Sequence, residues 1–349
     1  MMNNISQTDR KVYFDYLRAL ATFAVMILHI SAQNWYTTDV NGFDWQVFNF
    51  FDSMVRWAVP IFVMISGALF LNRDISIKVL YSKYILRLVV SFVVWSIIYA
   101  LFSNGNIMDG MVEMVQGHYH MWFIFMIIGL YMIIPFIKPI VQNEHTMRYF
   151  LALSILFGMI VPEIRIFVND FGSDFLVKTV NTIGGDIDQM NMHMVLGYVS
   201  YFVLGYYLNS IDLTKKQRVL IYIMGLLGFA ATMGLDLRVA LMTQTYCDHY
   251  YGYLTLNVFL EAVAVFTWFK YRKYNNQTVN QLILKLSKYS FGAYLVHALV
   301  IEQLDNLIGL NSLSFNPVIS VPCIGIIVFV ISIGISALLN HVPVVKKYM

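Results

Sequence analysis

The sequence predicts an all-α fold, an integral membrane bundle of about ten transmembrane helices with both the N- and the C-terminus cytoplasmic. Of the 349 residues, 59% are hydrophobic and 12% are charged, and the mean hydropathy is +0.65. Soluble domains carry about 25% charged residues, so this composition excludes a soluble globular protein. The apolar residues also gather into runs of membrane length, separated by short basic turns.

The whole chain, residues 1–349, is predicted to form a single transmembrane domain, because no hydrophilic stretch is long enough to fold as a second one. A helix needs about 17 to 25 residues to cross a bilayer. The predicted spans are 13–32, 51–71, 82–102, 120–140, 149–168, 192–208, 219–235, 250–269, 290–308 and 318–339. The longest hydrophilic stretch, residues 163–191, is predicted to be a solvated loop or, as the alternative, a lid.

The basic residues orient these spans. With the N-terminus inside, the segments that face the cytoplasm hold 19 of the 23 Lys and Arg residues, as the positive-inside rule requires. Because these residues are spread along the chain rather than gathered in one patch, nucleic acid is not predicted as a partner. The two cysteines, Cys247 and Cys323, are predicted to be free, since one possible pair is no disulfide framework.

The first span carries ionisable groups at membrane depth. Arg18 and His29 are 11 residues apart, which places them about 20° apart around the helix axis and about 16 Å apart along it. Asp15 extends the same face by one turn. Ionisable groups inside a membrane are costly and normally face a bundle interior or a wet cavity. This stripe therefore predicts a functional site, and a hydrogen-bonded structural histidine is the alternative for His29.

The orientation sorts the intramembrane polar residues into two layers. The cytoplasmic layer contains Arg18, Arg87, Ser66 and Gly67, and the exterior layer contains His29, Arg56, His120 and Trp122. Arginines in the first layer suit a phosphorylated cytosolic ligand, because guanidinium binds phosphate bidentately and stays charged. A histidine in the second layer suits proton transfer from a hydroxyl group.

Motifs along the chain resemble the membrane-bound acyltransferase family 3. They are DYLRALATFAVMILH (15–29), RWAVPIFVMISGALFL (56–71), the basic turn ending in Arg87, HMWFIFMIIGLYMIIPFI (120–137) and LSKYSFGAYLVH (286–297). Arg18 and His29 match the family's Arg-x10-His pair, and Arg87 matches its cytoplasmic arginine motif. The nearest likeness is to the branch that modifies enterobacterial common antigen and intercellular adhesin.

The resemblance implies an integral membrane O-acyltransferase, in the first instance an O-acetyltransferase, in a bacterial plasma membrane. Its donor would be cytoplasmic acyl-CoA, in the first instance acetyl-CoA, and its acceptor a hydroxyl of an extracytoplasmic sugar or surface glycan. No bound cofactor is expected. The predicted catalytic residues are His29, Arg18 and Arg56, with His29 as a general base or as a transient acyl carrier and Arg56 stabilising the oxyanion. The predicted substrate-binding residues are Arg18, Arg87, Asp15, Ser66, Gly67, His120, Trp122, Tyr294 and His297.

Three alternatives stay open at this point. Ser290, Tyr294 and His297 share one face of the ninth span, and structural hydrogen bonding between helices would explain them equally well. His118 and His120 have metal-ligand spacing, but no third ligand recurs nearby, so no metal is predicted. A transporter or flippase for a saccharide or lipid-linked glycan is the alternative function, and it would bind its cargo without any need for acyl-CoA.

Overall fold

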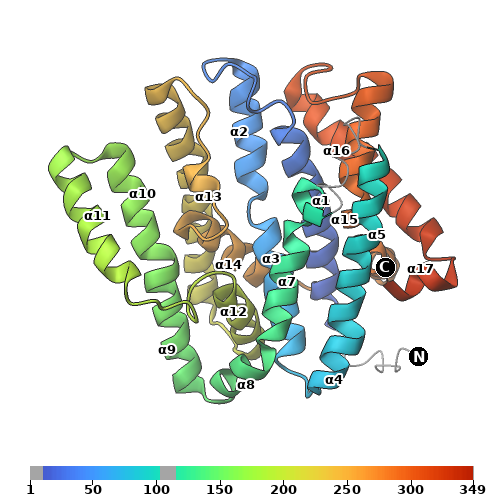
Figure 1. Ribbon diagram of the computed structural model, residues 1–349, viewed down its shortest axis with the longest axis horizontal. Coiled ribbons are helices and arrows are strands. Elements are labelled where there is room, and N and C mark those ends of the chain that lie inside the picture. The colour runs from blue at the N-terminus through green and yellow to red at the C-terminus, as the bar shows by residue number, and fades with distance from the viewer. Residues whose placement is uncertain (1–10, 103–114, 349) are drawn as a thin grey trace.

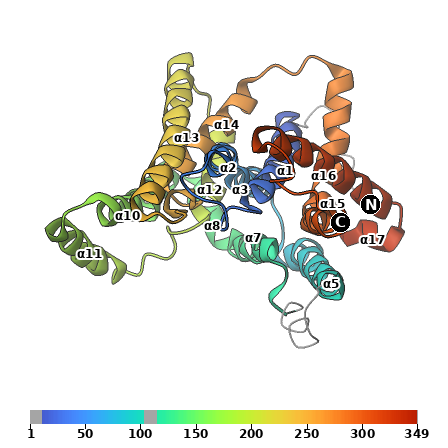
Figure 2. The same ribbon diagram turned by 90° about the horizontal axis from the view of Figure 1, so that it is seen from above.

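The computed structural model describes residues 11–102 and 115–348, and within these residues it contains helices and no strand. The predicted all-α class is therefore confirmed. Figure 1 shows the helices standing side by side, and Figure 2 shows α1, α2 and α3 in the middle of the group. Which end of the bundle faces the cytoplasm stays the prediction made from the Lys and Arg residues.

The first helix lies in the core. α1 (Tyr13–Ala32) packs against α2 (Phe43–Val55), α3 (Ala58–Phe70), α15 (Gln277–Ile308) and α16 (Pro317–Leu339). Of the most apolar stretch of α1, 72% is buried, whereas only 22% of that of α13 (Lys215–Thr243) is buried. The remaining elements are α4 (Ile77–Val79), η2 (Leu80–Ile85), α5 (Leu86–Phe102), η3 (Tyr119–Met121), α7 (Trp122–Met132), α8 (Ile134–Gln142), α9 (Glu144–Ile155), η4 (Leu156–Ile160), α10 (Val161–Phe171), α11 (Asp174–Asp188), α12 (Val199–Ser210), η5 (His249–Tyr251), α14 (Leu256–Tyr271) and α17 (Pro343–Tyr348).

Seven helical segments in the described chain are long and apolar enough to cross a membrane, or eight if the bent pair α7 and α8 is one span. The pair bends by 59° where Pro135 interrupts the hydrogen-bond ladder between them. The predicted sixth span, 192–208, coincides with a helix only from Val199, and α12 has 12 residues. The predicted ninth span, 290–308, is the second part of α15, whose first turns are polar.

The second predicted span is broken in its first half. α2 and α3 are separated by Arg56 and Trp57. Pro60 explains the break, because proline has no N–H to donate and its ring crowds the carbonyl group four residues earlier, that of Arg56. The motif RWAVP thus places Arg56 at the junction of two helix ends.

Two glycines bring α3 and α12 into backbone contact. A Cβ atom on Gly67 would lie 1.7 Å from the carbonyl oxygen of Phe202, and one on Gly205 would lie 2.0 Å from that of Met64. Small residues of this kind let membrane helices approach closely. Gly67, which the sequence placed among ligand-binding residues, is therefore accounted for by helix packing.

The hydrophilic stretch 163–191 is a helical hairpin rather than an irregular loop. It belongs to α10 and α11, which lie at one edge of the molecule (Figure 2). Arg165 and Asp188 join the two helices by an ion pair of 2.9 Å, and Asp170 accepts a hydrogen bond of 3.0 Å from His249. The hairpin is thereby held to the segment that follows α13.

Candidate functional site

A polar cluster surrounds Arg18 near the start of α1. Its guanidinium donates to the hydroxyl of Ser287 on α15 at 2.9 Å and lies 3.6 Å from the carboxylate of Asp15. Ser287 in turn donates to Asp15 at 2.7 Å. The ion pair and the hydroxyl fix the direction of the guanidinium, and 30% of the Arg18 side chain remains exposed. Ser287 was missed in the sequence, although it lies one turn before Ser290 on the predicted polar face.

Arg87 belongs to the same layer. It lies within electrostatic range of Arg18, and its guanidinium lies over the ring of Phe291, 5.1 Å from the centroid. The Tyr131 hydroxyl lies against Ser66 and within electrostatic range of both arginines. The structure thus brings together Arg18, Arg87 and Ser66, which the sequence assigned to one layer. Two guanidinium groups beside hydroxyl donors can bind a phosphorylated ligand.

At the other end of α1, His29 pairs with His297 of α15. The His29 Nδ1 and His297 Nε2 atoms are 2.7 Å apart, and the two rings lie 11° from parallel with their centroids 4.9 Å apart. His297 is fully buried, and its Nδ1 lies 2.6 Å from the carbonyl oxygen of Tyr294. His297 was predicted as a substrate contact; in the structure it contacts the predicted catalytic histidine directly.

These contacts fix the protons of the neutral imidazoles. A carbonyl oxygen only accepts, so the His297 Nδ1 carries the proton and donates it to Tyr294. The His297 Nε2 then accepts from the His29 Nδ1–H, and the His29 Nε2 is left with a lone pair. His29 is therefore arranged as a proton acceptor.

A second histidine pair lies beside the first. His118 is 2.7 Å from the carboxylate of Glu302 through its Nε2 and 3.0 Å from the His120 Nδ1 through its own Nδ1. A neutral His118 donates to Glu302 and accepts from the His120 Nδ1–H. His120 is 2% exposed. The rings of His120 and His29 are 6.4 Å apart, so the two histidine pairs are neighbours in the protein interior.

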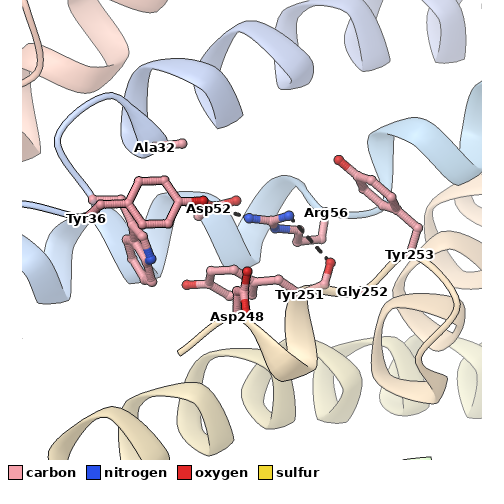
Figure 3. Close-up of a pocket in the computed structure, with 9 residues that line it drawn as sticks. Ala32, Tyr36, Asp52, Arg56, Asp248, Tyr251, Gly252 and Tyr253 are labelled. Carbon is pink, nitrogen blue, oxygen red and sulfur yellow. Dashed lines mark hydrogen bonds and ion pairs between the residues drawn. The ribbon is translucent and has the colours of Figure 1, made fainter. Parts of the chain in front are cut away.

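Arg56 forms one wall of a cavity of about 240 Å³. It pairs with Asp52 at 2.7 Å, lies 4.1 Å above the ring of Tyr251 and donates to that residue's carbonyl oxygen at 3.5 Å. Figure 3 shows the guanidinium between these two partners. The Arg56 Nε is buried without a partner in the described residues. Arg56 also lies within electrostatic range of His29.

Tyr253, also on the cavity wall, connects the cavity to Trp122, whose ring stacks on it at 5.7 Å. Tyr294 donates to the backbone oxygen of His120 at 2.7 Å, which holds the two histidine pairs together. At the cavity mouth, burial and then the Asp248 carboxylate raise the pKa of Tyr36 above its ordinary value. Asp52, Tyr251 and Tyr253 were missed in the sequence. Of these three residues, only Asp52 could have been found from the sequence, because it lies at i, i+4 spacing from Arg56.

The side chains in this region are not arranged as a metal site. Across the described residues, no group of three or more His, Cys, Asp or Glu side chains is placed to hold a metal ion. Both cysteines are free, as predicted, and burial raises the pKa of the Cys247 thiol.

The family model described as acyltransferase domain, family 3, matches residues 11–339, nearly the whole chain. The chain belongs to membrane-bound acyltransferase family 3. Neither the curated proteins nor the solved structures gave a match. This family 3 member is therefore an acyltransferase and a multi-pass membrane protein, and the alternative of a transporter or flippase receives no support.

Proposed function

We propose that this acyltransferase moves an acyl group, in the first instance acetyl, from cytoplasmic acyl-CoA to a hydroxyl of an extracytoplasmic sugar or surface glycan. It would act in the plasma membrane of a bacterial cell. The observation that carries the proposal is the contact of the His29 Nδ1 with His297 at one end of α1, which leaves the His29 Nε2 as a proton acceptor, while the arginine cluster lies at the other end. The proposal needs no bound cofactor.

The donor would be held at the start of α1. Arg18 and Arg87 would bind the phosphate groups of the CoA nucleotide, with Asp15, Ser287 and Ser66 orienting the guanidinium groups and the ligand. Arg18 and His29 are separated by about 16 Å of helix, a length comparable to an extended pantetheine arm. The thioester would then lie close to His29 while the nucleotide stays on the cytoplasmic side.

The acceptor hydroxyl would be activated by His29. His297 holds the His29 ring with its Nε2 lone pair available, so the imidazole can take the hydroxyl proton as the oxygen attacks the thioester carbonyl. The C–S bond then breaks, and CoA leaves with a proton supplied by the imidazolium. In the alternative route the His29 Nε2 attacks first and carries the acyl group to the sugar. The unpartnered N–H of Arg56 supports a role in stabilising the oxyanion.

The test uses purified protein in lipid nanodiscs with radiolabelled acetyl-CoA. We expect release of CoA and, when a glycan acceptor is added, transfer of the label to the glycan. Wild-type protein that neither binds nor turns over acyl-CoA would contradict the proposal.

A further inference from the structure

The cavity beside Arg56 lies one helical turn beyond His29, because Ala32 is part of its wall. Residues three apart on a helix share a face, so the cavity and His29 lie on the same face of α1. The cavity volume of about 240 Å³ is somewhat below the range of drug-sized pockets. It suits one small ring rather than a chain.

One buried atom in the cavity wall lacks a hydrogen-bond donor. Asp52 is 1% exposed, and its Oδ2 accepts from Arg56 at 2.7 Å. Its Oδ1 has no partner in the part of the chain that the structure describes. Leaving a buried carboxylate oxygen without a hydrogen-bond donor destabilises the structure. A ligand hydroxyl that donates to this oxygen would remove this destabilisation.

The remaining wall is aromatic. Trp35, Tyr36, Tyr251 and Tyr253 line the cavity, and Trp35 is held against the ring of Tyr251 at 5.4 Å. Aromatic side chains present apolar faces with polar tips. A wall of this kind, next to a carboxylate that accepts hydroxyl protons, matches a sugar ring, which has C–H groups on its faces and hydroxyl groups on its edge.

The cavity carries more negative than positive charge. Its wall contains two carboxylates, Asp52 and Asp248, and one guanidinium, Arg56. The guanidinium is already neutralised by Asp52, so the charge of Asp248 remains. A like charge brought beside it would be repelled.

We propose that this cavity is the acceptor subsite of the acyltransferase and that it takes a sugar ring without a carboxylate or phosphate group. The inference rests on the proposed function, since it names the acceptor for the same reaction. It assigns binding roles to Asp52, Asp248 and Trp35.

Binding is tested without acyl transfer. Ala32→Cys, in a Cys323→Ser background, places a thiol in the cavity wall, and its labelling by a charged thiol reagent is timed. We expect methyl glucoside to slow labelling and methyl glucuronide, which differs by its carboxylate, to slow it less. Phe175→Cys on exposed α11 is the control and should be labelled at the same rate with or without either sugar.

The charge of Asp248 is tested in the same assay. Asp248→Asn should reduce the difference in labelling rate between the two glycosides by about two- to fivefold, the scale of one exposed charge pair. Asp186→Asn removes an equal charge from the hairpin and should leave the difference as it was. Equal protection by both glycosides in the wild-type cavity, or protection by neither, would overturn the inference.

The two experiments distinguish a failure of the proposed acceptor subsite from a failure of the proposed acyl transfer. Protection by methyl glucoside without any turnover of acetyl-CoA would leave a sugar site and remove the proposed transfer reaction. Acetyl transfer to a glycan without protection of Ala32→Cys would keep the reaction and place its acceptor elsewhere.

Discussion

The two ends of α1 hold their ionisable groups in different ways. At the start of the helix, Arg18 keeps a permanent charge and is held by a carboxylate and a hydroxyl. At the end, His29 is held by a neutral partner, His297, which itself donates to a backbone carbonyl group. The first arrangement suits binding of a charged ligand, and the second leaves a lone pair for proton transfer. The groups suited to ligand binding and the group suited to proton transfer thus lie at opposite ends of one helix.

The two histidine pairs at the outer end differ as well. The His29 pair ends on the Tyr294 carbonyl oxygen, which does not take up a proton under ordinary conditions. The His120 pair ends on the carboxylate of Glu302, of which 42% is exposed. The first pair therefore keeps its proton within the site, and the second has a route to solvent. We expect the first to be essential and the second to be accessory.

The largest effect on acyl transfer is expected when the His29 imidazole is removed. His29→Ala should lower acyl transfer by about 10² to 10⁴, the usual cost of losing a general base, while leaving the amount of protein in the membrane unchanged. His145→Ala, on an exposed part of α9, is the matched control. A His29→Ala protein with more than a tenth of the wild-type rate would remove His29 from the reaction. Mass spectrometry of trapped enzyme separates the two routes, because an acyl adduct on His29 appears only in the carrier route.

The next effect concerns the charged end. Arg18→Lys keeps the charge but loses the planar fork that binds phosphate, so the KM for acetyl-CoA should rise about ten- to hundredfold. Arg87→Lys should act in the same direction, and alanine should act more strongly at both positions. Arg73→Lys, exposed between α3 and α4, should leave KM unchanged. Unaltered binding of acetyl-CoA by Arg18→Ala would place the donor elsewhere.

A smaller effect tests whether His297 positions His29. His297→Ala removes the acceptor of the His29 Nδ1–H and should reduce kcat about three- to tenfold, the value of one hydrogen bond. His297→Gln keeps an acceptor oxygen and should recover part of the loss. Since KM for acetyl-CoA should not change in either variant, kinetics distinguish positioning from a general loss of folding. Equal losses in the two variants would show that the hydrogen bond is not what matters.

The smallest effect should follow from Glu302→Gln, which keeps an acceptor for His118 and removes only the charge. We expect a loss in kcat of less than about fivefold, since the carboxylate is partly exposed. Glu144→Gln, which disturbs the exposed pair with Arg148, serves as the control. A loss in kcat as large as that of His29→Ala would contradict the accessory role of the second histidine pair. The path from His120 through His118 to Glu302 would then be the main path of the proton.

Much of this arrangement could be predicted from the sequence. Contacts between residues that are far apart along the chain could not. Helical spacing was sufficient to place Arg18 and His29 on one face, and the i, i+4 rule was sufficient to group Tyr294 with Ser290. The contact of His29 with His297 spans 268 residues, so no local pattern encodes it. Tyr251 and Tyr253 follow α13, and nothing near them indicates that they meet Arg56. The packing role of Gly67 could not be predicted for the related reason that its partner, Phe202, is far along the chain.

The large sequence distance between α1 and its partners also sets the order in which the parts of the site are synthesised. The partners of α1, Ser287 and His297, are synthesised roughly 15 to 50 s after it, at about 5 to 20 residues per second. During that interval α1, whose hydropathy of 1.3 is the lowest of the seven apolar spans in the described chain, enters the bilayer before α15 exists. Asp15 and Arg18 are three residues apart and can neutralise each other at once. The ion pair can therefore stabilise this charged helix in the membrane until Ser287 and His297 have been synthesised.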